Sequence, residues 1–282
     1  MLVMTDKTVS ILANIDSGEY HQAEMLCKSH TARLIKDRKR TEVSDLLTSV
    51  LAKLATRPPA DLADNPNFLL GLLEIATKNF EDCKSEETFP AALLQSFLSL
   101  FALTPFSMPK AKALQKLNKT FFASANDSIS TFLTRDALKS ANYSLAQNFS
   151  LLSSDAKLAI SLLDKWASEG GPDEKVWFVA RYVLLKLASD RTSDARLIFT
   201  HYSSEELFAA CRPLGNFLRF LLKAIDLQSA EVFLKLREKF AEFLRRDPEF
   251  SDILDRIGTT HFGIVKERQP SMLEMMSRMM GM

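Results

Sequence analysis

Residues 232–244 read VFLKLREKFAEFL, and this stretch decides the class of fold. Its apolar side chains recur every three or four residues, with charged side chains between them. One face of a helix built from it carries Val232, Phe233, Leu236, Phe240, Phe243 and Leu244, and the other carries Lys235, Glu238, Lys239 and Glu242. This spacing is typical of an amphipathic α-helix, so the stretch predicts one.

The same period recurs along the chain, for example in residues 46–54 and 176–187. The two-residue alternation that marks a β-strand is absent from the sequence. Short breaks separate the periodic segments, and each contains a residue that stops or starts a helix. They are Asp16-Ser17-Gly18, Arg57-Pro58-Pro59, Asp64-Asn65-Pro66, Thr104-Pro105, residues 169–172, Arg212-Pro213 and Asp247-Pro248. The chain is therefore predicted to be all-α, with short loops joining antiparallel helices.

Two segments resemble each other, Gly18–Ala23 (GEYHQA) and Ala141–Ala146 (ANYSLA). Each places a tyrosine three residues before an alanine, which suits close packing within a helix pair and is the kernel of a tetratricopeptide-like pattern. A bundle of this many helices rarely keeps one core. We therefore expect a right-handed α-solenoid of stacked helix hairpins.

The composition excludes several classes of function. The 282 residues carry 36 Lys plus Arg against 35 Asp plus Glu, a net charge of +1, so no global field draws the molecule to nucleic acid or lipid. Only 8 residues are glycine, and no phosphate-binding glycine motif is present. We expect no nucleotide site.

Catalytic and metal sites are not expected either. The three cysteines lie far apart, and the four histidines have no Ser or Cys partner at a diagnostic spacing. The sequence predicts no enzyme, no cofactor and no metal. It shows no secretory signal and no run of about 20 apolar residues that would span a membrane, so we expect a cytoplasmic protein without direct membrane insertion.

The most pronounced charge feature is residues 28–40, KSHTARLIKDRKR. Six cations stand there against the single acid Asp37. These cations are either a solvated helix end, favoured by the helix dipole, or a docking patch for an acidic protein face. Nucleic acid is not expected, because the run is short, lacks interleaved aromatic residues and has no matching basic stripe elsewhere.

The last residues of the sequence are rich in methionine, with six of the ten methionines in residues 272–282. As a helix, this segment would carry one apolar stripe, formed by Met272, Leu273, Met275, Met276, Met279 and Met280. The stripe is either a cap on the chain's own helices or a strip for a partner or an apolar client.

Several blocks, in order along the chain, resemble a known family, the fourth factor of the guided-entry-of-tail-anchored-proteins pathway. The blocks are Gly18–Ala23, Lys28, Arg33, Thr41-Glu42, Ala141–Phe149, Trp177–Ala180, Ala195–Tyr202, Pro213–Ala224, Leu244–Pro248, Leu254–Gly258 and His261–Gly263. The resemblance is weakest between residues 56 and 135.

The resemblance implies an α-solenoid scaffold in two continuous halves, residues 1–135 and 136–282. The first half would dock the pathway's ArsA-like targeting ATPase, and the second would dock a ubiquitin-like protein. The expected ATPase-docking residues are Tyr20, Lys28, Arg33, Lys36 and Lys39. The expected residues for the ubiquitin-like partner are Phe217, Phe220, Leu221, Arg256 and Phe262.

The implied function is that of a non-enzymatic adaptor in the insertion of tail-anchored proteins into the ER membrane. Two alternatives stay open at this point. One is a helical subunit of another assembly, such as a proteasome-lid-like or vesicle-coat-like complex. The other is an enzyme, which a nucleotide or metal in the purified protein would reveal.

Overall fold

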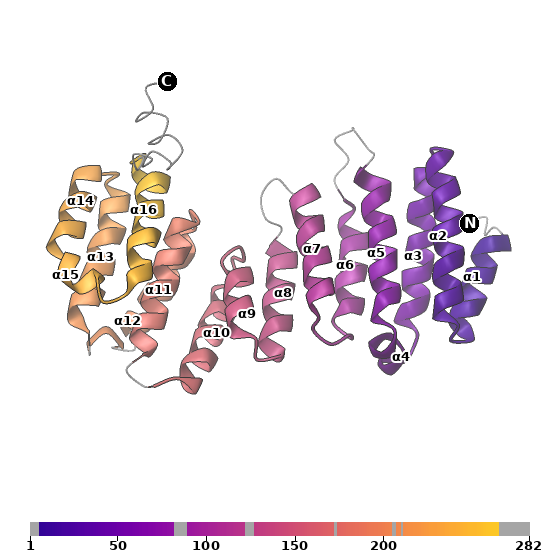
Figure 1. Ribbon diagram of the computed structural model, residues 1–282, viewed down its shortest axis with the longest axis horizontal. Coiled ribbons are helices and arrows are strands. Elements are labelled where there is room, and N and C mark those ends of the chain that lie inside the picture. Colours follow the sequence, from indigo (N-terminus) through magenta and orange to yellow (C-terminus); the bar gives the residue numbers. More distant parts are fainter. Residues whose placement is uncertain are drawn as a thin grey trace, which may run out of the picture. The chain divides into compact units, whose positions relative to one another are not determined.

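The computed structural model describes residues 6–81, 89–121, 127–171, 174–204, 207–209 and 211–264. This part of the chain contains sixteen α-helices, one short 3-10 helix and no strand (Figure 1). The all-α prediction is therefore confirmed. The methionine stripe of residues 272–280 lies outside the described residues.

The chain divides into two compact units, residues 1–153 (unit 1) and 154–282 (unit 2). Unit 1 contains α1 (Asp6–Asp16), α2 (Tyr20–Lys36), α3 (Arg40–Ala55), α4 (Pro59–Asp64), α5 (Pro66–Glu81), α6 (Ala91–Phe101), α7 (Met108–Phe121), α8 (Asp127–Lys139) and α9 (Tyr143–Ser150). Unit 2 contains α10 (Ala156–Glu169), α11 (Lys175–Ala188), α12 (Thr192–Ser204), the 3-10 helix η1 (Leu207–Ala209), α13 (Arg212–Asp226), α14 (Ala230–Lys239), α15 (Ala241–Leu244) and α16 (Pro248–Phe262).

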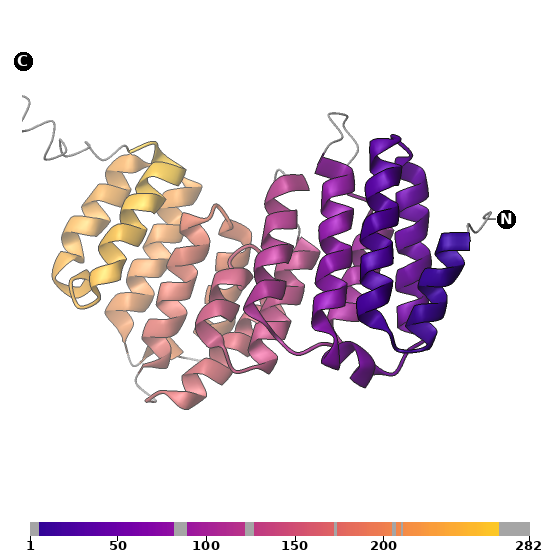
Figure 2. The ribbon, with the colours of Figure 1, turned by 45° about the vertical axis from the view of Figure 1, so that its right-hand side comes forward.

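The helices of unit 1 stack as successive hairpins (Figure 2). Helix α2 packs on α5, and α5 packs on α7, while α1 packs on α3, and α3 packs on α6. The apolar stripe predicted within residues 46–54 is the buried side of α3, where Leu46, Leu47, Val50, Leu51 and Leu54 are all at most 4% exposed. Burial of such stripes from both layers forms the core of the unit.

Five hairpin turns share one backbone geometry, centred on Gly18, Arg38, Ala141, Asp190 and Gln228, all of which have positive φ. Around Arg38, the N–H of Lys39 donates to the carbonyl of Leu34, and the N–H of Arg38 donates to that of Ile35. This pair of hydrogen bonds is the Schellman motif that ends a helix, and its left-handed position is usually occupied by glycine. Only the first of the five turns has a glycine. That turn was among the helix breaks predicted from the sequence, and the other four were not.

The two similar segments GEYHQA and ANYSLA occupy equivalent positions in this geometry. Gly18 and Ala141 are the left-handed residues of their turns. Tyr20 and Tyr143 begin the next helix. Ala23 and Ala146 have no exposed surface, as close packing within a helix pair requires.

Unit 2 is built around α11, which packs on α10, α12 and α16. The prediction of one helix across residues 232–244 is wrong at Phe240, where α14 ends and α15 begins. The Phe240 ring lies 5.5 Å from Phe217 of α13, whereas Phe243 stacks on Trp177 of α11 at 5.3 Å. The two rings therefore pack on different helices, and the break between α14 and α15 at Phe240 allows them to point in these different directions.

Candidate interaction surfaces

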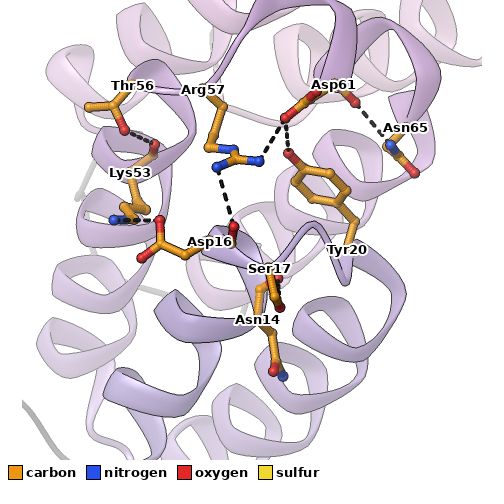
Figure 3. A network of polar contacts seen from close by, with 9 residues as sticks. All are labelled: Asn14, Asp16, Ser17, Tyr20, Lys53, Thr56, Arg57, Asp61 and Asn65. Carbon is orange, nitrogen blue, oxygen red and sulfur yellow. Dashed lines mark hydrogen bonds and ion pairs between the residues drawn. The ribbon is translucent and has the colours of Figure 1, made fainter.

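The network at the start of unit 1 centres on Tyr20 and Asp61 (Figure 3). The Tyr20 hydroxyl donates to Oδ2 of Asp61 at 3.1 Å, and Nη2 of Arg57 donates to the same oxygen at 2.9 Å. Arg57 also donates to the backbone carbonyl of Asp16 at 3.3 Å, while the Asp16 carboxylate pairs with Lys53 at 2.7 Å. The network therefore joins the α1–α2 turn to α3 and α4.

Tyr20 is one of the residues predicted to dock the ATPase, and its ring lies inside unit 1. The side chain is 6% exposed and packs on Phe68 with ring centroids 5.8 Å apart. Burial is the main cause that raises the pKa of Tyr20. Its position is that of a residue that holds the first hairpin, not of one that presents a side chain to a partner.

Lys28 projects from the middle of α2 over α5. Its Nζ lies 2.7 Å from Oε1 of Glu24, and this bond raises the pKa of Lys28. Gly71 of α5 leaves room for the pair, because a Cβ on Gly71 would lie 2.5 Å from the same Glu24 oxygen. Lys28, Glu74 and Lys78 line two hollows, one of about 430 Å³ between α2 and α5 and one of about 610 Å³ that α7 also lines. Three acids and three cations line the larger hollow, whereas two lysines and one glutamate line the smaller one and leave it one excess positive charge.

Arg33, Lys36 and Arg38 form a second group at the end of α2, and all three are exposed. None of them has a carboxylate within ion-pair distance in the part of the chain that the structure describes. Because successive residues turn by about 100° in an α-helix, Lys28 and Arg33 point about 140° apart, with Lys36 between them. Lys39 is exposed in the turn and pairs with Glu42 at 2.9 Å. The predicted cationic residues are thus split between two flanks of α2, and two of them already hold a carboxylate.

The residues predicted for the ubiquitin-like partner also separate in the structure. Phe217 and Leu221 have no exposed surface and belong to the core of unit 2. Phe262 is half-buried and stacks on Phe233, with ring centroids 4.7 Å apart. Phe220 of α13 and Arg256 of α16 are exposed. Of the five predicted residues, these last two are the exposed ones.

Sequence reasoning missed a basic stripe on α13. Arg212, Arg219 and Lys223 are exposed on one side of this helix, near the exposed Phe220 and Leu227. The statement that no basic stripe matches residues 28–40 is therefore wrong. The cations of α13 stand seven and four residues apart, and the helical period was the signal that would have found them.

Two buried lysines were also missed. Lys110 pairs with Asp136 at 2.7 Å, and Lys186 pairs with Asp194 at 3.4 Å. Nζ of Lys110 donates to the carbonyl oxygens of Phe101 and Thr104, both at 3.2 Å. Burial lowers the pKa of Lys110, and the Asp136 carboxylate acts in the opposite direction. Paired and hydrogen-bonded in this way, the lysines are structural.

The histidines are dispersed among the helices. His261 is held by the backbone, with Nε2 2.7 Å from the carbonyl oxygen of Leu187. Burial lowers the pKa of His30. Within the described ranges, no three His, Cys, Asp or Glu side chains are grouped as a metal ion would require. No helix there has both the length and the apolar character needed to cross a membrane.

Comparison with known proteins gives a consistent set of similarities. Residues 17–280 match the family model described as Golgi to ER traffic protein 4. The chain is 28% identical over 271 residues to "Golgi to ER traffic protein 4 homolog" of Oryzias latipes, covering 92% of this chain and 81% of that protein. The homologue from Homo sapiens is also 28% identical over 271 residues, covering 92% and 80%.

A solved structure shares the fold. The match to "Crystal structure of C. therm. Get4" has a TM-score of 0.72 at 16% sequence identity and covers 98% of this chain and 96% of that chain. At this level of sequence identity, the similarity shows a shared fold and nothing about function. It agrees with the predicted solenoid of helix hairpins.

Proposed function

The chain belongs to the Golgi to ER traffic protein 4 family, and on that basis we propose that it is a non-catalytic, cytoplasmic adaptor in the insertion of tail-anchored proteins into the ER membrane. In this proposal, the N-terminal half binds the ArsA-like targeting ATPase and the C-terminal half binds a ubiquitin-like protein. The division at residues 135 and 136 is part of the proposal. No nucleic acid is expected as a partner.

The observation that carries the proposal is the family match, which extends from residue 17 to residue 280 and so spans both compact units. Each unit has its own buried core and its own exposed cations. Two self-contained units with separate charged faces suit a protein that holds two partners. The all-α fold would also suit the proteasome-lid-like or coat-like alternative, and it is the family match that favours the adaptor.

Within this proposal, we assign the ATPase-docking surface mainly to Arg33, Lys36 and Arg38. These cations have no internal carboxylate among the described residues, so a partner's acidic groups would meet them without first displacing one. Lys28 and Lys39 hold Glu24 and Glu42 and would have to release them. Tyr20 contributes indirectly by fixing the start of α2 through Asp61.

The test is a charge reversal, Arg33→Glu with Lys36→Glu, measured as affinity for the targeting ATPase from the same organism. We expect the affinity to fall by at least about tenfold, because clustered cations attract an acidic partner and fix its position on the surface. The affinity of the variant should also depend less on salt, because salt screens such charge interactions. Lys28→Glu alone should have a smaller effect.

Lys112→Glu with Lys119→Glu is the matched control, because it reverses two exposed cations on α7 of the same unit. Helical content by circular dichroism should be the same in wild type and both double variants. Equal ATPase affinity in the two double variants would overturn this docking surface. Loss of helical content would disqualify a variant, and Arg33→Gln with Lys36→Gln would replace it.

A further inference from the structure

The stretch from residue 88 to residue 126 contains lysines and no acidic residue. Its cations are Lys110, Lys112, Lys116 and Lys119. The whole chain, by contrast, balances 36 Lys plus Arg against 35 Asp plus Glu. Lys110 is the buried partner of Asp136, so the other three lysines supply the surface charge of this stretch.

These three lysines form one row on α7. Lys112, Lys116 and Lys119 are all exposed, and they stand four and three residues apart, so they share one face of the helix. In the part of the chain that the structure describes, no ion pair joins Lys112 or Lys119 to a carboxylate. Lys116 lies 3.6 Å from Glu81 in an exposed pair, which contributes little. The α7 lysine row is therefore positively charged.

An uncharged apolar loop precedes the row. It consists of residues 102–107 and joins α6 to α7. Leu103 in this loop is 41% exposed, and Met108, the first residue of α7, is 45% exposed. The loop is held from inside, because Nζ of Lys110 donates to the carbonyl oxygens of Phe101 and Thr104. Two apolar side chains are thus presented at a fixed place beside the lysines.

A fourth exposed cation stands at the same end of unit 1. Helix α8 ends at Lys139, and this helix end and the α6–α7 loop both lie at the lower edge of the unit in Figure 1. Lys139 is near enough for its charge to act on Lys110. Burial is the main cause that lowers the pKa of Lys110, and the charge of Lys139 acts in the same direction. Cations and apolar side chains therefore occur together around this loop.

We propose that the α7 lysine row, together with Leu103 and Met108, binds an anionic lipid surface peripherally. The ammonium groups would meet the headgroups, since lysines near an anionic membrane are each attracted to it. The two apolar side chains would enter the interfacial layer, where binding grows with the apolar area buried. No membrane span is involved. The inference goes beyond the proposed function and requires neither of the partners named there.

An acidic protein segment and a nucleic acid are the competing occupants. The other exposed residues of α7 between Lys112 and Thr120 are polar, so an amphipathic helix laid along the row would find no apolar anchor. The row also has no aromatic residue or arginine, on which the bases of a single strand would stack. Its apolar side chains stand at one end only, which suits shallow entry into a lipid surface.

The test is sedimentation of the full chain with vesicles of phosphatidylcholine, with and without phosphatidylserine. We expect wild type to co-sediment only with the vesicles that contain phosphatidylserine, and to dissociate as salt is raised. Lys112→Glu with Lys119→Glu (the α7 reversal) should lower the partition coefficient by at least about tenfold. Lys112→Arg with Lys119→Arg, which keeps both charges, should bind as wild type does.

Leu103→Ser with Met108→Ser tests the apolar part of the site. This variant should bind the phosphatidylserine vesicles more weakly than wild type, with the same dependence on salt, because it removes apolar area and no charge. Unchanged binding would show that the loop does not enter the lipid surface and would overturn that part of the inference.

Lys157→Glu with Lys165→Glu is the matched control, because it reverses two exposed cations on α10 and lowers the net charge by the same amount. It should sediment as wild type does. Helical content by circular dichroism should be the same in all variants, and Lys112→Gln with Lys119→Gln would replace a reversal that loses it. The α7 reversal should keep its affinity for the ATPase, because α5 lies between α2 and α7.

No co-sedimentation of wild type, or equal losses in the α7 and α10 reversals, would overturn the inference and leave the adaptor proposal standing. Polyglutamate and single-stranded RNA are the probes for the competing occupants. Binding of either probe that the α7 reversal abolishes, without binding to vesicles, would identify a different occupant and also overturn the inference. Failure of the ATPase and the ubiquitin-like protein to bind would overturn the adaptor proposal alone.

Discussion

Lys110 and Asp136 join α7 to α8 through an ion pair of 2.7 Å, with side chains that are only 2% and 7% exposed. A buried pair is costly to break, because removal of one partner leaves the other charge without compensation. Lys110→Met and Asp136→Leu should each lower the free energy of unfolding by about 3–5 kcal/mol.

The double variant Lys110→Met with Asp136→Leu should be less destabilised than the sum of the two single variants, by about 1–3 kcal/mol. Urea unfolding of wild type and the three variants measures this difference. Additive effects would contradict an energetic coupling between the two side chains.

Cys27 gives a pH-dependent prediction. Burial raises the pKa of its thiol to about 12, whereas a free thiol has a pKa of about 8.5. Between these values the unfolded chain loses a proton that the folded chain keeps, so rising pH favours unfolding. The free energy of unfolding of wild type, relative to that of Cys27→Ala, should fall by about 1.4 kcal/mol per pH unit above pH ~9.

Denaturant unfolding of both proteins under reducing conditions, at several alkaline pH values, measures this. Subtraction of the Cys27→Ala values removes the effect of all other groups. A difference that stays constant with pH would show that Cys27 ionises in the folded protein as it does in the unfolded one.

Ala141 lies in the left-handed region at φ 53° and closes the α8–α9 turn. A Cβ is strained there, and glycine is not. Ala141→Gly should therefore stabilise unit 1 by about 0.5–1 kcal/mol. Ala146→Gly, within helix α9 and fully buried, should destabilise by about 1 kcal/mol or more. Thermal unfolding of the two variants should shift in opposite directions, and shifts of the same sign would contradict the turn geometry.

Gly215 of α13 packs so closely against Phe208 that no side chain fits at this position. A Cβ at this position would lie 2.7 Å from Cβ of Phe208, an atom held near the backbone of η1. Gly215→Ala should destabilise by about 1–3 kcal/mol through overpacking, although alanine favours helices. Gly71→Ala is the comparison, since its clash is with the movable end of Glu24. It should cost much less, and equal losses of stability in the two variants would contradict this reading.

The helical period was sufficient to predict the class of fold and most helices. Helix ends predicted from glycine and proline were also found, as at Gly18 and at Pro248, the first residue of α16. The turns at Arg38 and Gln228 were not predictable from residue type, because these side chains rarely adopt positive φ, whereas Asp190 belongs to a residue type that adopts it more often. The surrounding hairpin imposes that backbone conformation on them.

The candidate surfaces were less predictable than the helices. The family resemblance placed Phe217, Phe220 and Leu221 together as docking residues, yet only Phe220 faces outward. Lys28 and Arg33 were grouped for their charge, although they lie on different flanks of α2. Lys110 looks like a surface cation in the sequence, and its burial depends on Asp136, which lies 26 residues further on.

The central claim is that two separate faces of this chain hold two partners at the same time. The direct measurement is a calorimetric titration of the ubiquitin-like protein into the preformed complex of the full chain with the targeting ATPase, checked by the mass of the product. We expect the same affinity as for the free chain and one complex that contains all three proteins. Displacement of the ATPase by the ubiquitin-like protein, or no binding to the preformed complex, would contradict the claim.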